Sequence, residues 1–242
     1  MAVCAANRSI FLLGDSVSHR IFHYGFAPLL NCTEADPTIS FTAETSNGYK
    51  NDTGLICHGN GVTRIGYTIH FGVFESGYHW HWPGHKPHGA SNNSRTNVLL
   101  ALQEFQHRTE GTNDSVLFMF HSAAWDMLRY TQHTNLYKGR EDWLDRYQDK
   151  YTTLMIEIRA KLRKQDQLVI ATMHEMQPFD LRPLNERAKR VARHLQIPLF
   201  DQAKLLGTRK EYLVDGIHQN PAASMKIAEN ILANNFVLLP IQ

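Results

Sequence analysis

The chain has 242 residues, of which 43% are hydrophobic and 20% are charged. This length suits one domain, and this composition allows a sizeable buried core, which argues against wholesale disorder. The formal net charge is +2, and the sequence has no basic stripe, so we expect no nucleic-acid partner. The sequence has no stretch of about 18 apolar residues, so we expect no stable membrane insertion of this chain.

The cysteines and the glycosylation sequons bear on the compartment. Cys4, Cys32 and Cys57 allow one disulfide and leave one odd thiol. The N-terminus lacks a charged region followed by an apolar run, so we expect no signal peptide and a cytoplasmic chain as it stands. Asn-x-Ser/Thr sequons exceed the roughly two that chance predicts, which favours a lumenal or extracellular protein if the chain is a fragment. The sequons begin at Asn7, Asn31, Asn51, Asn92 and Asn113.

Apolar runs alternate with helical patterns along the chain, which predicts an α/β fold with a mainly parallel sheet. In chain order we expect a strand at Ile10–Leu13, a helix at about Val17–Leu30, strands at Leu55–Cys57, Tyr67–Phe74 and Val116–Phe120, a helix at Glu141–Arg163, a strand at Leu168–Thr172, a helix at about Leu184–Leu195, a strand at Pro198–Phe200 and a last helix from Pro221. We interpret residues 1–242 as a single domain with a long loop or insertion at about 65–97.

The first chemical motif stands at the end of the first predicted strand. An apolar run ends in the glycine turn at Gly14, and Ser16 follows at the start of a helix. Backbone N–H groups and the positive end of the helix dipole lie beside a hydroxyl in that position. A serine there can attack a carbonyl while its own N–H holds the developing oxyanion. The position also suits a simple N-cap, so this segment alone leaves both interpretations open.

The second motif is a pair, Asp215 and His218, in a predicted loop directly before the last helix. There the His can take the serine proton, and the Asp can fix the tautomer of the ring and stabilise the imidazolium. The alternative is a loop Asp that makes a turn beside a surface His. Loops at the carboxyl ends of the strands form the site in open α/β sheets, and both motifs fall on such loops. Together they predict a catalytic triad of Ser16, His218 and Asp215.

In order and spacing, nearly the whole chain resembles the SGNH/GDSL hydrolase superfamily, whose members begin with Gly-Asp-Ser and end with Asp-x-x-His before a terminal helix. Here Gly14, Asp15 and Ser16 stand at the first place, and Asp215 and His218 at the second. The resemblance implies a three-layer α/β/α sandwich around a mainly parallel, flavodoxin-like sheet of about five strands. It also implies ester hydrolysis or acyl transfer that uses no metal and no organic cofactor.

Three segments are similar to the PC-esterase branch of that superfamily, which includes plant polysaccharide O-acetyltransferases and the lumenal domain of the sialate O-acetyltransferase. These segments are Gly14–Arg20, His121–Tyr130 and the late run from Leu199 to His218. From them we expect Arg20, Trp125 and Asp126 to bind substrate. Trp125 also fits a core position, and that alternative stays open.

The expected oxyanion hole departs from the superfamily pattern. An Asn usually follows the central strand and donates to the oxyanion, whereas His121 stands at that place here. A neutral imidazole can donate one hydrogen bond, so His121 is expected to keep the role. Otherwise His121 packs structurally, and Ser122 or a backbone N–H serves the oxyanion. The superfamily's other donor is a glycine N–H after the second strand, and here we prefer Gly59 over Gly61, with a plain turn as the alternative.

The run from His79 to His88 contains a His-x-His pair, which can chelate a metal. It has no Cys and no carboxylate, and proline breaks the spacing, so we predict no metal site. The run is either a bland exposed loop or a sugar-binding lip, because Trp80 and Trp82 offer flat faces to a pyranose ring. From the second interpretation we expect Trp80 to bind substrate.

The motifs together predict a serine-dependent O-acyl esterase, in particular an O-acetyl esterase, that acts on a small-molecule or carbohydrate ester. One alternative is an O-acyltransferase with the same triad. The other is a non-catalytic binding module on a degenerate hydrolase fold. The sequence does not separate hydrolysis from transfer, because exclusion of water from a pocket is a property of its shape.

Overall fold

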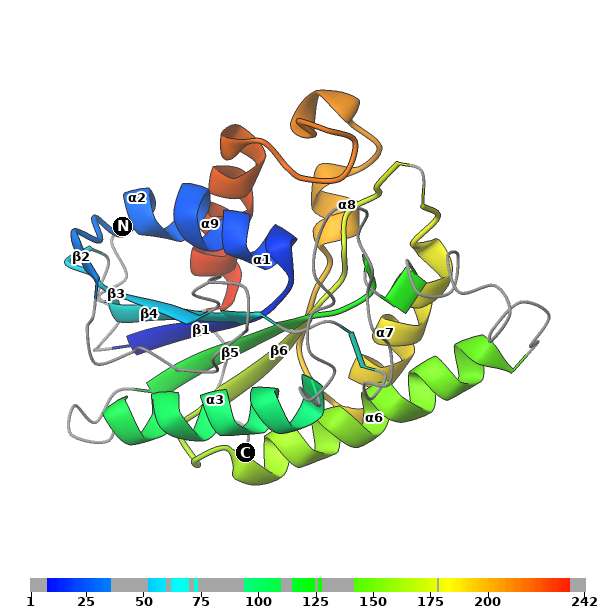
Figure 1. Ribbon diagram of the computed structural model, residues 1–242, viewed down its shortest axis with the longest axis horizontal. Helices are drawn as coiled ribbons and strands as arrows, with labels where there is room; N and C mark the ends of the chain where they lie inside the picture. Colours follow the sequence, from blue (N-terminus) through cyan, green and yellow to red (C-terminus); the bar gives the residue numbers. More distant parts are fainter. Residues whose placement is uncertain are drawn as a thin grey trace, which may run out of the picture.

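The computed structural model describes residues 8–35, 52–59, 62–69, 72–73, 94–109, 115–124, 126–127, 142–177 and 179–235. Within these ranges, seven strands form one sheet, and helices cover both of its faces (Figure 1). One face carries α1 (Ser16–Arg20) and α9 (Pro221–Asn235), and the other carries α3 (Ser94–Thr109) and α6 (Trp143–Lys161). The predicted three-layer α/β/α fold is confirmed.

The strands are β1 (Arg8–Gly14), β2 (Glu34–Ala35), β3 (Asp52–Ile56), β4 (Val62–Ile69), β5 (Ser115–His121), β6 (Gln167–Ala171) and β7 (Leu199–Phe200). They lie in the order β2-β3-β4-β1-β5-β6-β7. Strands β4, β1, β5, β6 and β7 are parallel neighbours, whereas β3 pairs antiparallel with both β2 and β4. The parallel strands follow the flavodoxin-like order, and β2 and β3 make the sheet larger than predicted.

Two predicted strands are displaced in the structure. The run Leu55–Cys57 lies at the end of β3, which is antiparallel and so is not the second parallel strand. That second strand is β4, which starts at Val62, ahead of the predicted start at Tyr67. The half-buried polar residues Thr63 and Arg64 interrupt the apolar pattern of β4, so the sequence of its first half does not indicate a strand.

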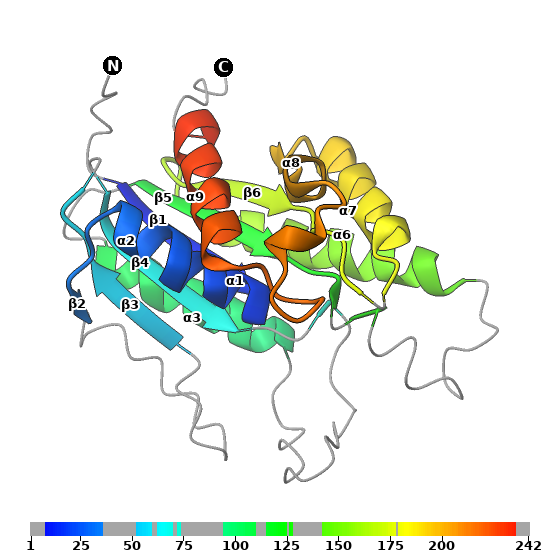
Figure 2. The same cartoon turned by 90° about the horizontal axis from the view of Figure 1, so that it is seen from above.

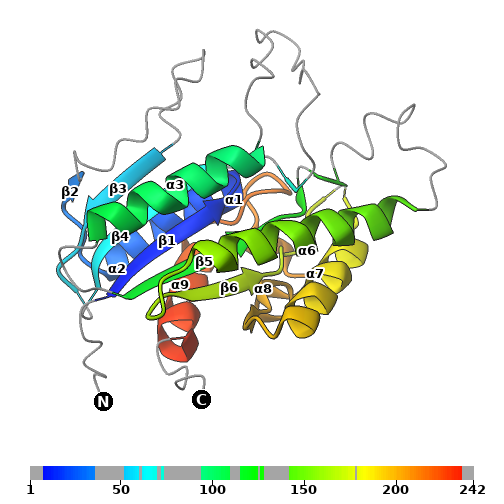
Figure 3. The same ribbon diagram turned by 90° about the horizontal axis from the view of Figure 1, so that it is seen from below.

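The predicted helix at Val17–Leu30 is divided into α1, the π-helical segment η1 (Ile21–Phe26) and α2 (Ala27–Leu29). The remaining helical segments are α7 (Arg182–Leu195), α8 (Gln202–Leu206) and the 3-10 turn η3 (Lys210–Tyr212). The sequence does not predict α3, and its start at Ser94 corrects the end of the loop expected over about 65–97. Helices α3 and α6 lie side by side across one face of the sheet (Figure 3).

The core is centred on β1 and β5. The segments Ile10–Leu13 and Phe118–Phe120 are fully buried, as expected for apolar strands covered on both faces. Phe11 stacks on Phe105 of α3 with 4.5 Å between the ring centroids. Gly66 of β4 leaves room for these two rings, because a Cβ there would lie 2.6 Å from each of them.

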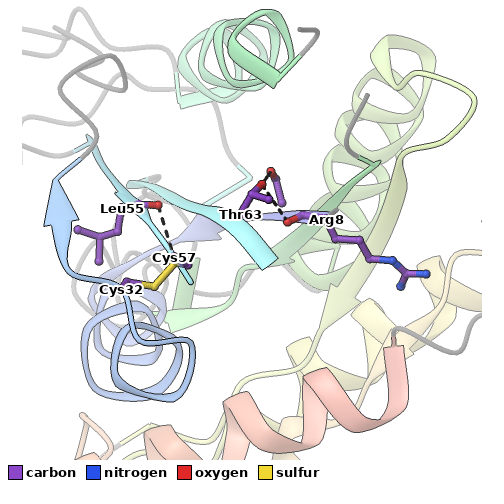
Figure 4. The surroundings of a disulfide bond; sticks show 6 residues. Arg8, Cys32, Leu55, Cys57 and Thr63 are labelled. Atoms are coloured by element: carbon purple, nitrogen blue, oxygen red, sulfur yellow. Dashed lines mark hydrogen bonds between the residues drawn. A yellow bond between two sulfur atoms is a disulfide. The ribbon is translucent and has the colours of Figure 1, made fainter. Parts of the chain in front are cut away.

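A disulfide joins Cys32, which follows α2, to Cys57, which follows β3 (Figure 4). Cys4, the third cysteine, lies outside the described residues. The disulfide ties the edge of the sheet to the helical layer, next to the hydrogen bond from His58 N–H to the Leu30 carbonyl. Within the described ranges, no helix has both the length and the apolar character needed to cross a membrane.

The topology brings the segment after β1 and the segment before α9 together at the carboxyl ends of the parallel strands. The parallel strands share one direction, so the segments that follow β1, β5 and β6 all lie at their carboxyl ends. In Figure 2 the orange segment that precedes α9 passes beside the start of α1. Because β1 has its neighbours β4 and β5 on opposite sides, this edge is the topological switch point where open α/β sheets bind ligands.

Candidate active site

Ser16 is the first residue of α1 and is partly exposed. The N-cap of α1 is Asp15, whose Oδ1 accepts a hydrogen bond from Val17 N–H at 2.9 Å. Asp15 therefore performs the capping role that the sequence left open for Ser16, and the Ser16 hydroxyl points elsewhere. The turn that precedes it needs a glycine, because a Cβ on Gly14 would lie 2.0 Å from Ser18 Oγ.

The Ser16 hydroxyl lies against the loop before α9. Ser16 Oγ is 2.8 Å from His218 Nε2, although the two residues are 202 positions apart in the chain. His218 Nδ1 is 2.6 Å from Asp215 Oδ2. The structure thus brings Ser16, His218 and Asp215 together in a continuous hydrogen-bonded chain at the carboxyl end of β1.

The protonation of this chain follows from Asp215. Partial burial raises the pKa of Asp215, but hydrogen bonds from the His218 backbone, the His218 ring and the Ile217 N–H outweigh burial and lower this pKa to about 2. A carboxylate that is ionised at neutral pH can only accept hydrogen bonds. In the neutral tautomer that this arrangement favours, His218 Nδ1 carries the proton, and Nε2 accepts the hydrogen bond from the Ser16 hydroxyl.

Hydrogen bonds between α1 and the loop before α9 hold Ser16 and His218 next to each other. Arg20 Nε donates to the Gln219 carbonyl at 2.6 Å. In return, the buried Gln219 side chain donates to the Val17 carbonyl at 2.7 Å. The described contact ties α1 to the loop, and the expectation that Arg20 binds substrate stays a prediction.

A buried polar chain runs beneath the site from α1 to the loop. Ser18 Oγ lies 3.0 Å from His121 Nδ1, and His121 Nε2 lies 3.0 Å from Gln202 Oε1. Gln202 Nε2 then lies 2.9 Å from His174 Nδ1, and His174 Nε2 lies 2.8 Å from the Ile217 carbonyl. The chain ends next to His218, so it links the floor of the site to the loop that carries the His.

Three of the four hydrogen bonds in this polar chain have a fixed direction, and the direction of the fourth follows when the His121 ring is neutral. Burial lowers the pKa of His174 to about 4, so this ring is neutral at physiological pH. A carbonyl only accepts, so His174 Nε2 must carry the proton and its Nδ1 must accept from the Gln202 amide. The amide oxygen of Gln202 then accepts from His121 Nε2–H. In a neutral His121 ring, Nδ1 accepts from the Ser18 hydroxyl. Four side chains are satisfied by one consistent set of protons.

This chain corrects the expectation that His121 donates to the oxyanion. His121 is 1% exposed, and a neutral imidazole has a single N–H. That N–H is directed at Gln202. The structural alternative for His121 therefore fits the described geometry, and no sequence signal identifies its partners because Ser18 and Gln202 are distant in the chain.

Gly59 also lies away from Ser16, which corrects its expected oxyanion role. It precedes β4, whose Val62 is paired with Arg8 at the amino end of β1, whereas Ser16 follows the carboxyl end of β1. The glycine that follows the second parallel strand is Gly72, a buried residue with a φ of +93°. The sequence missed Gly72 because the apolar run of β3 was interpreted as the second strand.

Asp126 is enclosed by protein in the structure. It is fully buried, accepts from Ser122 Oγ at 2.7 Å and from Val73 N–H at 3.1 Å, and so joins the segment after β4 to the segment after β5. This position corrects its expected role in substrate binding. Trp125 and Trp80 lie outside the described residues.

A cavity of about 710 Å³ lies beside the loop rather than over Ser16. Its lining includes His174, Gln177, Tyr212 and Leu213, and it includes neither Ser16 nor His218.

Among the described residues, no three His, Cys, Asp or Glu side chains gather in a way that could hold a metal ion. The run from His79 to His88 lies outside those residues.

No family model and no curated protein sequence matches the chain. Solved structures do match it, among them a member of the lipolytic protein G-D-S-L family from Veillonella parvula. The two sequences are 14% identical, the match covers 96% of this chain and 100% of that chain, and the TM-score is 0.51. An acetylxylan esterase, Axe2, from Geobacillus stearothermophilus has 13% identity, coverage of 100% and 99%, and a TM-score of 0.47. The chain therefore has the fold of the SGNH/GDSL hydrolases.

Proposed function

We propose that this chain, which has the SGNH/GDSL hydrolase fold, is a serine-dependent ester hydrolase whose catalytic triad is Ser16, His218 and Asp215. One observation carries the proposal: Ser16 Oγ is 2.8 Å from His218 Nε2, and His218 Nδ1 is 2.6 Å from Asp215 Oδ2. These distances are within the reach expected of a nucleophile, its base and the group that orients the base.

In the proposed reaction, the Ser16 hydroxyl attacks the ester carbonyl while His218 Nε2 takes its proton. His218 then gives that proton to the alkoxide leaving group, and an acyl-enzyme remains on Ser16. Water, deprotonated by the same Nε2, attacks the acyl-enzyme and releases the acid and free Ser16. Asp215 stays ionised throughout because its pKa is about 2, and it stabilises the imidazolium that forms in each half of the reaction.

The Ser16 N–H is the oxyanion donor that we propose for the tetrahedral intermediate. The next N–H, that of Val17, is already bonded to the Asp15 carboxylate, so it is not the donor. A backbone N–H at the start of a helical segment points along the axis, at the positive end of the dipole, where a developing negative charge is stabilised.

An O-acetyl ester of a carbohydrate is the substrate class that we propose. The support is the similarity of Gly14–Arg20 and of the run from Leu199 to His218 to the PC-esterase branch, whose members handle O-acetyl groups on sugars. The triad itself places no limit on the acyl group, so a small activated ester such as p-nitrophenyl acetate is a suitable first substrate.

The test is hydrolysis of p-nitrophenyl acetate by the wild-type chain and by Ser16→Ala. Loss of the nucleophile should lower kcat by about 10³-fold or more. Thr153→Ala is the matched control, because it removes an exposed hydroxyl from α6 and should leave kcat unchanged. Full activity of Ser16→Ala would refute the proposal. Adding an oligosaccharide acceptor and analysing the products by mass spectrometry distinguishes the two reactions, because hydrolysis releases the free acid whereas transfer adds the acyl group to the oligosaccharide.

A further inference from the structure

The sequon Asn31-Cys32-Thr33 stands on the surface directly after α2. Asn31 and Thr33 are exposed, and Asn31 has a φ of 51°, in the left-handed region. Its N–H donates to the Pro28 carbonyl at 3.2 Å, and the Cys32 N–H donates to the Ala27 carbonyl at 2.9 Å. Asn is one of the few residues that tolerate this backbone conformation at the end of a helix, so the turn presents its side chain at the surface.

The middle residue of this sequon supplies an independent observation. Cys32 is disulfide-bonded to Cys57 (Figure 4). Disulfides form and persist in oxidising compartments such as the lumen of the endoplasmic reticulum, and they are rare in the cytosol. Sequon asparagines of secreted proteins receive their glycans in surface loops. The same surface turn therefore contains a disulfide, which indicates an oxidising compartment, and a sequon asparagine that can be glycosylated in that compartment.

The described structure separates this sequon from the one at Asn7. The hydroxyl residue of that sequon is Ser9, which is 0% exposed in β1 and lies 3.3 Å from Thr63 Oγ1. The asparagines at positions 7, 51, 92 and 113 lie outside the described residues. Within the described residues, Asn31 and Thr33 thus form a sequon whose acceptor and hydroxyl are both at the surface.

The position of Asn31 keeps a glycan clear of the candidate active site. The Leu30 carbonyl accepts from His58 N–H, in the segment that leads into β4 beside the amino end of β1. Ser16 follows the carboxyl end of β1. The helical segments between Ser16 and Asn31 span roughly 20 Å at about 1.5 Å per residue. A sugar chain on Asn31 therefore projects from the opposite edge of the sheet.

We propose that Asn31 carries an N-linked glycan and that this chain matures in an oxidising secretory compartment. The co-reactant is a lipid-pyrophosphate-linked oligosaccharide. Asn31 Nδ2 forms a bond to the anomeric carbon, the bond from that carbon to the pyrophosphate oxygen breaks, and one amide proton is lost as lipid pyrophosphate leaves. The cell's own transferase performs this step, and Thr33 supplies the hydroxyl that the sequon requires.

The experiment uses the full chain secreted from eukaryotic cells behind a cleavable signal. A background with Asn7→Gln, Asn51→Gln, Asn92→Gln and Asn113→Gln leaves the sequon at Asn31. We expect this protein to migrate more slowly in gel electrophoresis, by the mass of one glycan. Treatment with peptide N-glycosidase should abolish this shift. Adding Asn31→Gln or Thr33→Ala should abolish the shift, whereas Thr33→Ser, which keeps the hydroxyl, should retain it.

Peptide mapping of the unsubstituted chain gives the same answer without relying on the folding of any variant. The expected result is a glycan on the peptide that contains Asn31, together with a Cys32–Cys57 cross-linked peptide after deglycosylation. An Asn31 peptide recovered unmodified from secreted protein would overturn the proposal, as would a shift that survives Thr33→Ala. Esterase activity of Asn31→Gln should equal that of the wild-type chain, because the glycan lies away from Ser16.

Discussion

At the scale of the residue, the site depends on an ionised Asp215 that fixes the proton of His218. Asp215 receives three hydrogen bonds from the next turn of chain, from Ile217 N–H, His218 N–H and His218 Nδ1. These bonds are local, so the motif Asp-x-x-His carries most of the geometry of the base within itself. The contact with Ser16 is the part that the fold must add.

Asp215→Asn tests this arrangement. An amide in place of the carboxylate can donate to His218 Nδ1 and so favours the wrong tautomer, with the proton on Nε2. We expect kcat on p-nitrophenyl acetate to fall by about 10³- to 10⁴-fold while the fold is kept. Asp180→Asn, which alters an exposed carboxylate paired with Arg182, is the control and should change nothing. Unchanged kcat in Asp215→Asn would remove Asp215 from the triad.

Asp15 is a second carboxyl group whose pKa is shifted by its surroundings, and this shift makes the stability of the fold depend on pH. Burial raises the pKa of Asp15 from 3.8 to about 6, against the hydrogen bond from Val17 N–H, which lowers it. Between those two pH values the folded chain holds a proton that the unfolded chain has released. The Asp15 contribution to the free energy of unfolding is therefore largest at low pH, and it declines as the pH rises to about 6.

Asp15→Asn should remove this pH dependence, because the amide does not ionise and its oxygen can still accept from Val17 N–H. Relative to the wild-type chain, the variant should gain up to about 3 kcal/mol in free energy of unfolding between pH 4 and pH 7. Chemical denaturation across that range measures the difference. Asp142→Asn, at an exposed site, serves as the control. Parallel pH profiles for Asp15→Asn and the wild-type chain would contradict the assignment.

At the scale of the element, α8 matters because its first residue, Gln202, connects β5 to the His218 loop. The Gln202 side chain is fully buried and bonds His121 on one side and His174 on the other. His174 in turn donates to the Ile217 carbonyl. We therefore propose that Gln202 is a positioning residue that acts on the site through two histidines.

Gln202→Met should leave the His121 N–H and the His174 Nδ1 buried without their partner. Each such loss costs about 1–3 kcal/mol, so we expect the free energy of unfolding to fall by about 2 kcal/mol or more. The released loop should also lower kcat more than it raises KM, because the His218 ring is less well placed. Gln103→Met, on the exposed side of α3, is the matched control. A variant with unchanged stability and kcat would show that the chain does not position the loop.

The sequence predicts local elements better than it predicts their neighbours. The strand before Ser16 and the motif at Asp215 are continuous in sequence, and their pattern indicates where each lies on the sheet. The partners of His121 come from α1 and α8, 103 and 81 positions away, and no local pattern specifies them. The Gly59 prediction fails for a related reason: β3 pairs antiparallel with β4, so it is not the second parallel strand, and no local pattern specifies that direction.

At the scale of the whole molecule, the fold joins chemistry from the two ends of the chain. Helix α9 packs closely on η1 at Gly25, where a Cβ would lie 2.5 Å from the Ser224 carbonyl oxygen. This packing places the loop before α9 beside the start of α1, and the Arg20 and Gln219 hydrogen bonds lock it there. In the proposed mechanism, Ser16 is therefore activated only when the sheet and both of these helical segments are assembled.

The most direct test of the central claim is labelling with a fluorophosphonate, which reacts with a serine that a neighbouring base has activated. Peptide mapping of the native chain should find one phosphonate, on Ser16. The label should disappear in urea, because unfolding separates Ser16 from a His218 that lies 202 positions away in sequence. It should also fall sharply in Asp215→Asn. A native chain that takes up no label, or that is labelled at another serine, would contradict the account.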